Sequence, residues 1–132
     1  MSDADGLPGR PSGRAGGVAR TALGADDAAA RLRDEGWSVG VVRGGATTAA
    51  FLDAVGTALD FPDRYGRNLD ALWDCLGDVA VATALVWEGW QELAVGAPDA
   101  WADAMSLLRE RAGDGAPFCV VLADAPPGRV RS

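Results

Sequence analysis

The sequence contains no lysine and no histidine, so all twelve of its basic residues are arginine. The absence of lysine excludes Schiff-base sites and the phosphate-binding lysine of a P-loop. The absence of histidine excludes the acid–base sites that depend on an imidazole. These two absences argue against an acidic α/β enzyme, and we expect a protein without catalytic activity, cofactor or metal.

Cysteine is also scarce, with only Cys75 and Cys119 in the chain. The two residues do not form a CxxC pair, so the spacing of a zinc or redox site is absent. Each lies within an apolar run, which predicts two buried, reduced thiols.

Long apolar runs are missing as well. No run approaches the about 20 residues of a membrane helix, and the N-terminus lacks the apolar core, roughly 7–15 residues long, of a signal peptide. The sequence therefore predicts a cytoplasmic protein with no membrane partner. Its 132 residues suit one domain plus a tail, and a hydrophobic content of 48% is typical of a folded chain rather than a disordered one.

Negative charge is what the sequence has in excess. The net charge is −7, and residues 36–132 carry thirteen acidic residues against seven arginines. A domain this acidic repels phosphate backbones, so we expect no nucleic-acid partner. A basic protein is the better partner, although the acidity could instead serve only solubility.

Four segments can be predicted along the chain. Residues 1–23 are rich in Gly, Arg, Ser, Ala and Pro without an apolar period, which indicates a disordered N-terminal tail. The alanine-rich residues 24–36 predict a short extra helix or a linker. Residues 37–125 form the predicted domain, and residues 126–132 are expected to fray.

The predicted domain alternates apolar strands with helices. Continuous apolar runs predict buried strands at residues 37–44, 82–90 and 117–124. Three helices and a short turn or helix are predicted between the strands. The first helix is capped by Thr47 or Thr48 and ended by Pro62, and the second runs from about Asn68 to Gly77. A short turn or helix follows at residues 90–95, and the last helix lies within residues 97–115. This order predicts an α/β fold, with a three-stranded parallel sheet packed with about four helices, plus the short N-terminal helix.

One stretch, FPDRYGRNLDALWDCLGD, is unusually acidic. Leu69, Leu72, Trp73 and Leu76 form an apolar stripe at helical spacing, and Asp70, Asp74 and Asp78 follow an adjacent face. Like charges four residues apart destabilise a helix by roughly 0.2–0.5 kcal/mol, and Asp74 has an aspartate one turn away on either side. The face is either simply solvated or it is a surface that attracts and docks cations.

Enzymatic interpretations of these residues fail. Asp70 and Asp74 point the same way from one helix, whereas the two carboxylates of a glycosidase flank a cleft. The segment RGGATT at residues 43–48 lacks both common phosphate-loop patterns, which favours a tight turn. A phospho-aspartate receiver domain needs a lysine that this chain does not have.

At these residues the sequence resembles the barstar family of intracellular ribonuclease inhibitors. The resemblance lies in Phe61-Pro62, then Tyr65-Gly66-Arg67-Asn68, then the run from Leu69 to Leu76, and a weaker similarity extends it to residues 37–124. It implies a three-layer fold of the kind predicted above. It also implies an inhibitor that plugs a ribonuclease active site with an acidic helix and the loop before it.

The resemblance implies a set of partner-binding residues. Asp70 and Asp74 match carboxylates that meet the enzyme's cations, with Asp74 in the place of the substrate phosphate, and Glu110 matches an acidic residue on the rim. The full set is Arg64, Tyr65, Gly66, Asn68, Leu69, Asp70, Trp73, Asp74, Asp78 and Glu110. The chain departs from the family at Arg64, where an aromatic residue is common, and in the loop GDVAVA after the helix, which lacks a second aromatic contact.

The expected partner is a small basic extracellular-type ribonuclease or a nuclease toxin, bound 1:1, with the free protein a monomer. The alternative is an immunity or interaction module of the same fold that binds a basic protein without nuclease activity.

Overall fold

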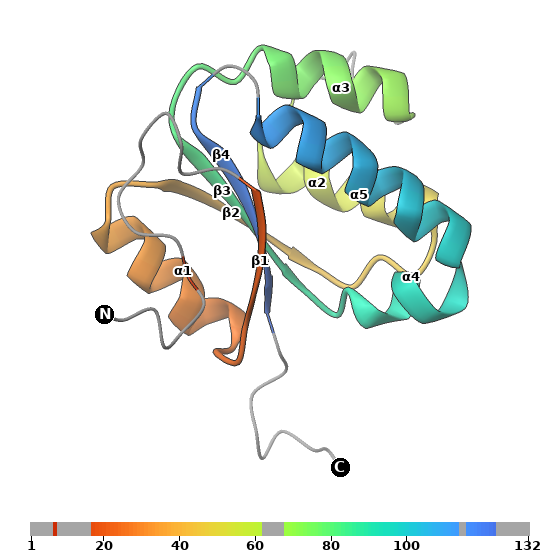
Figure 1. Ribbon diagram of the computed structural model, residues 1–132, viewed down its shortest axis with the longest axis horizontal. Coiled ribbons are helices and arrows are strands. Elements are labelled where there is room, and N and C mark those ends of the chain that lie inside the picture. The colour runs from red at the N-terminus through yellow and green to blue at the C-terminus, as the bar shows by residue number, and fades with distance from the viewer. Residues whose placement is uncertain (1–6, 8–16, 62–67, 114–115, 124–132) are drawn as a thin grey trace.

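The computed structural model describes Leu7 and residues 17–61, 68–113 and 116–123 of the chain. These residues form a four-stranded parallel sheet in the order β1-β4-β3-β2, together with five helices (Figure 1). The elements, in chain order, are β1 (Gly17–Thr21), α1 (Ala25–Asp34), β2 (Ser38–Arg43), α2 (Thr48–Ala58), α3 (Leu69–Gly77), β3 (Thr83–Glu88), α4 (Gln91–Gly96), α5 (Pro98–Ala112) and β4 (Phe118–Ala123).

The sheet has one strand more than the sequence predicts. Strand β1 lies inside the predicted tail of residues 1–23 and pairs in parallel with β4, from Gly17 opposite Cys119 to Thr21 opposite Ala123. The prediction of three strands was therefore wrong, and so was the assignment of residues 17–23 to a disordered tail. Five residues with Val18 as their only large apolar side chain give a weak local signal, and pairing with β4 decides the conformation. Residues 1–6, 8–16 and 124–132, which include the predicted frayed end, lie outside the described residues.

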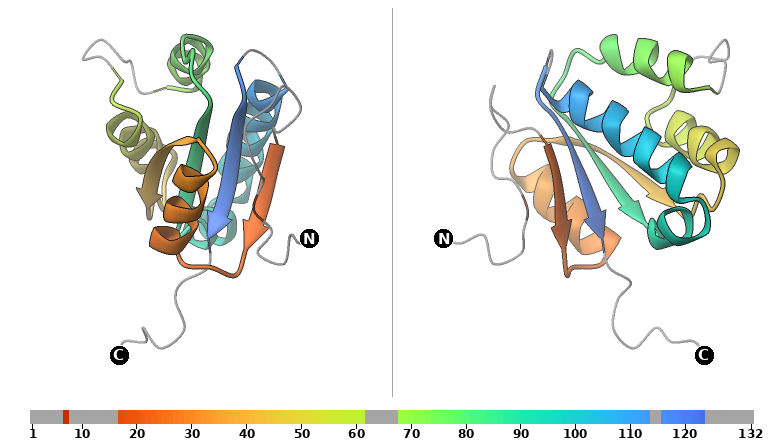
Figure 2. Two further views of the ribbon diagram at one scale, coloured as in Figure 1. Left: turned by 90° about the vertical axis from the view of Figure 1, so that its left-hand side faces the viewer. Right: turned by 45° about the vertical axis from the view of Figure 1, so that its right-hand side comes forward.

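The helices form two layers, one on each face of the sheet (Figure 2). The connection through α1 crosses the sheet from edge strand β1 to edge strand β2, whereas the later connections return through β3 to β4. Because crossovers between parallel strands are right-handed, a reversal of direction places the connecting helices on opposite faces. Helix α1 therefore covers one face alone, and α2, α3, α4 and α5 cover the other.

Each face of the sheet buries its own set of apolar side chains. Alternate residues of β3 point to opposite faces, so Leu85 and Trp87 pack beneath the four-helix layer, whereas Ala84 and Val86 pack against α1. Strand β4 alternates in the same way and is buried along its whole length. Burial on both faces explains why these two strands are continuous apolar runs in the sequence.

Local signals fix most of the predicted helices. The Thr47 side chain accepts a hydrogen bond from the Ala50 backbone N–H at 3.1 Å and caps α2, as predicted. Pro98 lies at the first position of α5, and Gly113 caps the end of that helix. The helices predicted at residues 24–36, 47–61, 68–77 and 97–115 are confirmed as α1, α2, α3 and α5, and the strand predictions match β2, β3 and β4. Within the described residues, no helix has the length and apolar character needed to cross a membrane.

Candidate partner-binding site

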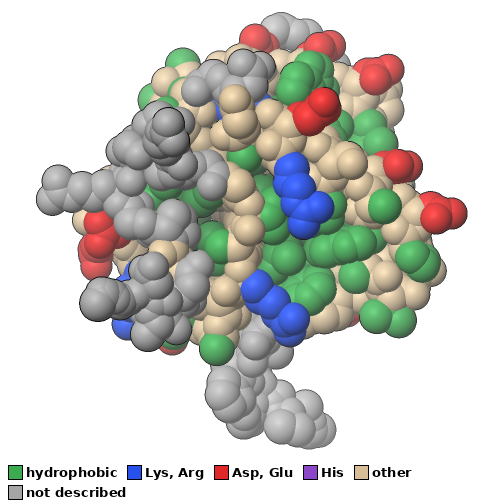
Figure 3. All heavy atoms as spheres, in the orientation of Figure 1, with side chains coloured by type: hydrophobic (Ala, Val, Ile, Leu, Met, Phe, Trp, Pro, Cys, Tyr) green, Lys and Arg blue, Asp and Glu red, His purple; other side chains and the backbone are tan. Residues whose placement is uncertain are grey.

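Helix α3 places the three predicted aspartates on the side of the helix that faces away from the core. Leu72 and Leu76 are fully buried, and residues two positions away lie about 200° around the helix from them. Asp74 is two positions from both leucines, so it points directly outward, flanked by Asp70 and Asp78. Figure 3 shows acidic side chains over the upper and right-hand part of its face, where Figure 1 places α3 and α5.

Asn68 caps the N-terminal end of α3. The Asn68 side chain accepts a hydrogen bond from the Ala71 backbone N–H at 2.7 Å, which satisfies one free donor of the first turn. Asp70 lies in that turn, where the helix dipole favours a negative charge. Asn68 therefore has a structural role in addition to the contact role that the family resemblance implies.

Within the described part of the chain, the aspartates of α3 have no ion-pair partner. Other acidic residues do have one: Arg43 pairs with both Asp26 and Glu88. The hydrogen bond that the Arg43 guanidinium donates to the Asp26 carboxylate raises the pKa of Arg43 more than any other interaction does. The negative charge of α3 is thus available to a partner, whereas that of Asp26 and Glu88 is already used inside the protein.

A buried arginine holds the C-terminal end of α3. Arg111 of α5 is 2% exposed, and its guanidinium donates hydrogen bonds to the carbonyl oxygens of Leu76 (2.8 Å), Ala116 (3.0 Å) and Val79 (3.3 Å). Helix α3 has no basic residue in its own last turn, and its C-cap residue is Asp78. Because the C-terminal end of a helix favours positive charge, Arg111 supplies from α5 the cation that α3 lacks.

A groove of about 390 Å³ separates α3 from α5. Leu69, Asp70 and Trp73 line it from α3. Asp103, Ser106, Leu107 and Glu110 line it from α5, at positions that share one face of the helix. Among the residues that the structure describes, Trp73, at 36% exposure, is one of three exposed large apolar side chains. The groove brings predicted Glu110 to the same surface as predicted Asp70.

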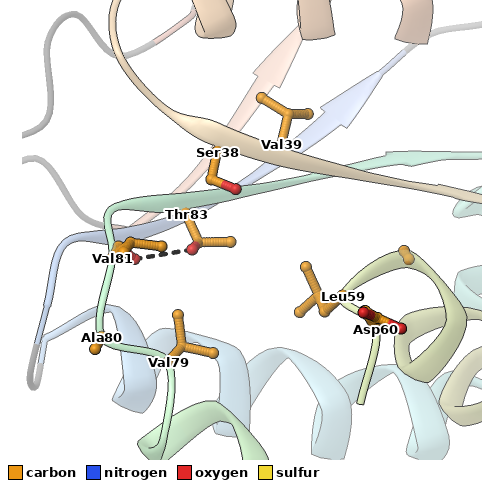
Figure 4. Close-up of a pocket in the computed structure, with 9 residues that line it drawn as sticks. Ser38, Val39, Leu59, Asp60, Val79, Ala80, Val81 and Thr83 are labelled. Atoms are coloured by element: carbon orange, nitrogen blue, oxygen red, sulfur yellow. Dashed lines mark hydrogen bonds between the residues drawn. The ribbon is translucent and has the colours of Figure 1, made fainter.

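A second cavity, of about 350 Å³, lies beyond the C-terminal end of α3 (Figure 4). Leu59 and Asp60, after α2, face Val79, Ala80 and Val81 across it. Ser38, Val39, Ala58 and Thr83 complete its lining. The Thr83 hydroxyl donates a hydrogen bond to the Val81 carbonyl at 2.9 Å, so its polar group is already used within the wall.

The structure thus brings seven of the ten predicted residues to one region: Asn68, Leu69, Asp70, Trp73, Asp74, Asp78 and Glu110. Arg64, Tyr65 and Gly66 lie outside the described residues. Sequence reasoning missed Asp103 and Arg111. Asp103 lies seven residues before Glu110 on one helix, and this spacing could have placed it on the same face as Glu110. Arg111 shares the buried face of α5 with Ala104 and Leu108, and this position could have indicated that it is buried.

Neither cysteine forms a disulfide, and only Cys119 is fully buried. Burial raises the pKa of the Cys119 thiol to about 12, so it remains protonated at neutral pH. Cys75, on α3, is half-buried, which corrects the prediction of two buried thiols. Among the described residues, no group of three or more cysteine, aspartate or glutamate side chains is arranged to hold a metal ion.

Comparison with known proteins assigns the family. Residues 41–123, more than half of the chain, match the family described as "Barstar (barnase inhibitor)". The chain belongs to the barstar family. It is also 62% identical over 34 residues to a Bacillus subtilis (strain 168) protein named "Putative ribonuclease inhibitor YrdF". That match spans 25% of this chain and 37% of the Bacillus protein.

Proposed function

We propose that this barstar-family protein inhibits a small basic ribonuclease by covering the active site of the enzyme with the acidic face of α3. The observation that carries the proposal is the outward row of Asp70, Asp74 and Asp78, which has no ion-pair partner among the described residues. Ribonuclease active sites bind the negatively charged phosphates of RNA with cationic side chains. A carboxylate is also negatively charged, so it can bind to the same cations in place of a phosphate. The protein then acts as an inhibitor rather than as an enzyme, and it forms a 1:1 complex.

Repulsion within the free protein favours such a complex. Asp70 and Asp74 of α3 and its C-cap residue Asp78 are spaced four residues apart, and like charges at this spacing destabilise a helix by roughly 0.2–0.5 kcal/mol for each pair. Partner cations remove this repulsion and form charge-assisted hydrogen bonds with the same carboxylates. The field of the row also steers a basic protein toward α3, so added salt should lower the association rate much more than it changes the dissociation rate.

Substitution of Asp74 tests the proposal, because folding and binding should respond in opposite directions. Asp74→Ala removes a mid-helix like-charge neighbour and improves helix propensity, so the free energy of unfolding should stay equal or rise by a few tenths of a kcal/mol. The free energy of binding should weaken by about 2–5 kcal/mol, which raises Kd at least about 30-fold. This range is the one found at charged protein interfaces, the barstar family's own among them. A thermal melt and an inhibition titration measure both quantities on one preparation.

Barnase, named in the family description, and the ribonucleases secreted by the producing cell are the enzymes to titrate. The matched control is Asp27→Ala, since Asp27 is exposed on α1, on the opposite face of the sheet, and its loss changes net charge equally. The control should inhibit nearly as well as the parent. If Asp74→Ala is destabilised and still inhibits fully, Asp74 is a structural residue and the proposal is wrong. If the same face captures a basic protein without nuclease activity, the protein is an interaction module instead.

A further inference from the structure

The groove between α3 and α5 adds two acidic side chains, Asp103 and Glu110, to the row on α3. Asp70 stands on the α3 wall, and Asp103 and Glu110 stand on the α5 wall. Asp103 and Glu110 are seven residues apart, which places them about 10 Å apart along the helix axis. One carboxylate therefore stands on the α3 side of the groove, and two carboxylates span about two helical turns on the α5 side.

The groove also has an apolar part. Leu69 and Trp73 contribute it from α3, and Leu107 contributes it from α5. Leu69 and Leu107 are partly buried against the core, so this apolar surface is fixed by the packing of the two helices. An apolar channel between carboxylates is complementary to a side chain with an aliphatic stem and a positive head, because such a side chain buries its stem and keeps its charge near the rim.

The carboxylates of the groove are not used inside the protein. Across residues 17–61, 68–113 and 116–123, neither Asp70, Asp103 nor Glu110 has an ion-pair or hydrogen-bond partner for its side chain. Arg109 and Arg111 lie on either side of Glu110 in the sequence, but the Arg111 guanidinium is turned inward to the end of α3. The negative charge of the groove is therefore uncompensated within the described structure.

We infer that Asp103 is a further partner-binding residue, and that it and Asp70 hold a lysine or arginine side chain of the partner in this groove. The identity of that partner rests on the proposed function, whereas the affinity of the groove for a cationic side chain does not. Asp103 would extend the interface along α5, two turns toward its N-terminus from Glu110. It would thereby select among basic partners according to whether a cation projects toward α5.

The test compares Asp103→Asn with Asp99→Asn. Both variants lose one charge from α5, but Asp99 lies one turn nearer the N-terminus and does not line the groove. With barnase as the probe, both should slow association slightly and to a similar extent. Only Asp103→Asn should speed dissociation, by about 10-fold, the lower end expected for a hydrogen bond to a charged group. Equal dissociation rates for the two variants, within twofold, overturn the inference and leave the proposed function standing.

A second measurement needs no protein partner. Argininamide, titrated into the free protein and followed by NMR, should give saturable shifts at the Trp73 indole N–H and the Leu107 amide. Asp99→Asn should preserve these shifts, and Asp103→Asn should weaken them. If barnase does not bind the parent protein, the proposed function fails for that enzyme, and this titration decides on the groove alone. Shifts that do not saturate, or that are unchanged in Asp103→Asn, overturn the inference.

Discussion

Arg111 offers the sharpest test of how α5 holds the acidic helix in place. Replacing it with methionine keeps an unbranched side chain of similar length over the Phe118 ring, on which the guanidinium lies at 5.2 Å from the ring centroid. The substitution removes every donor. Three carbonyl oxygens, of Leu76, Val79 and Ala116, then lose a hydrogen bond from a charged group.

The expected loss follows from the burial of those carbonyls. An unsatisfied buried acceptor costs about 1–3 kcal/mol. Only the bond to Leu76 is fully buried, whereas the carbonyls of Val79 and Ala116 are partly buried and can recruit water. Removing the buried charge also removes its own desolvation cost, which offsets part of the loss. Arg111→Met should therefore lower the free energy of unfolding by about 2–4 kcal/mol, or Tm by roughly 8–15 °C for a chain of this size.

Urea and thermal denaturation measure the effect, with Arg109→Met as the control. Arg109 is an exposed arginine in the same last turn of α5, so its replacement should stay within about 0.5 kcal/mol of the parent. Arg111→Lys keeps the charge, but an ammonium lacks the planar fork that reaches several carbonyls, so it should recover only part of the loss. If Arg111→Met and Arg109→Met are equally stable, the arginine does not anchor α3 and our account of that helix end is wrong.

Three further outcomes are expected. Deleting residues 1–23 removes strand β1 and should lower the urea midpoint clearly, whereas a disordered tail could be removed without loss. Gly40→Ala should lower the free energy of unfolding by about 1–3 kcal/mol, because the new Cβ would lie 2.7 Å from Leu59 Cδ2 and 2.9 Å from the Ala58 carbonyl oxygen. An unchanged Tm in a thermal melt would show that α2 can shift. The pKa of Cys119 is raised from 9.0 to about 12 by burial, so between these pH values the unfolded thiol ionises and the folded thiol does not. Stability should fall as pH rises through this window, and Cys119→Ala should reduce that slope.

The sequence was most informative where a local signal and a tertiary one agreed. Thr47 and Asn68 are good N-caps that each precede an apolar period, so α3 could be predicted to start after Asn68 and α2 after Thr47 or Thr48. The buried strands β3 and β4 could be predicted because both of their faces are covered, which leaves unbroken apolar runs. The outward direction of Asp74 followed from the helical period alone, although its role in binding stays a prediction.

The sequence was less informative where long-range contacts decide the outcome. Nothing in GVART indicates a strand until β4 is placed beside it. The helical period places Arg111 on the buried face of α5, but arginine is mostly exposed, and no local pattern reveals the α3 carbonyl oxygen that accepts its hydrogen bond. Asp103 enters the candidate site only because α5 packs alongside α3, which is a property of the assembled helix layer.

The pairing of β1 with β4 has a consequence for how the chain folds. The first strand leaves the ribosome long before its partner, because residues 17–21 pair with residues 119–123. Until then, β1 has no neighbour in the sheet, and the face that α1 covers lacks Cys119, Val121 and Ala123. Contacts between distant parts of a chain form late and slow folding. Completion of the sheet must therefore await the synthesis of β4, and a chain that stops before residue 118 leaves its N-terminal strand and the edge of β3 unpaired.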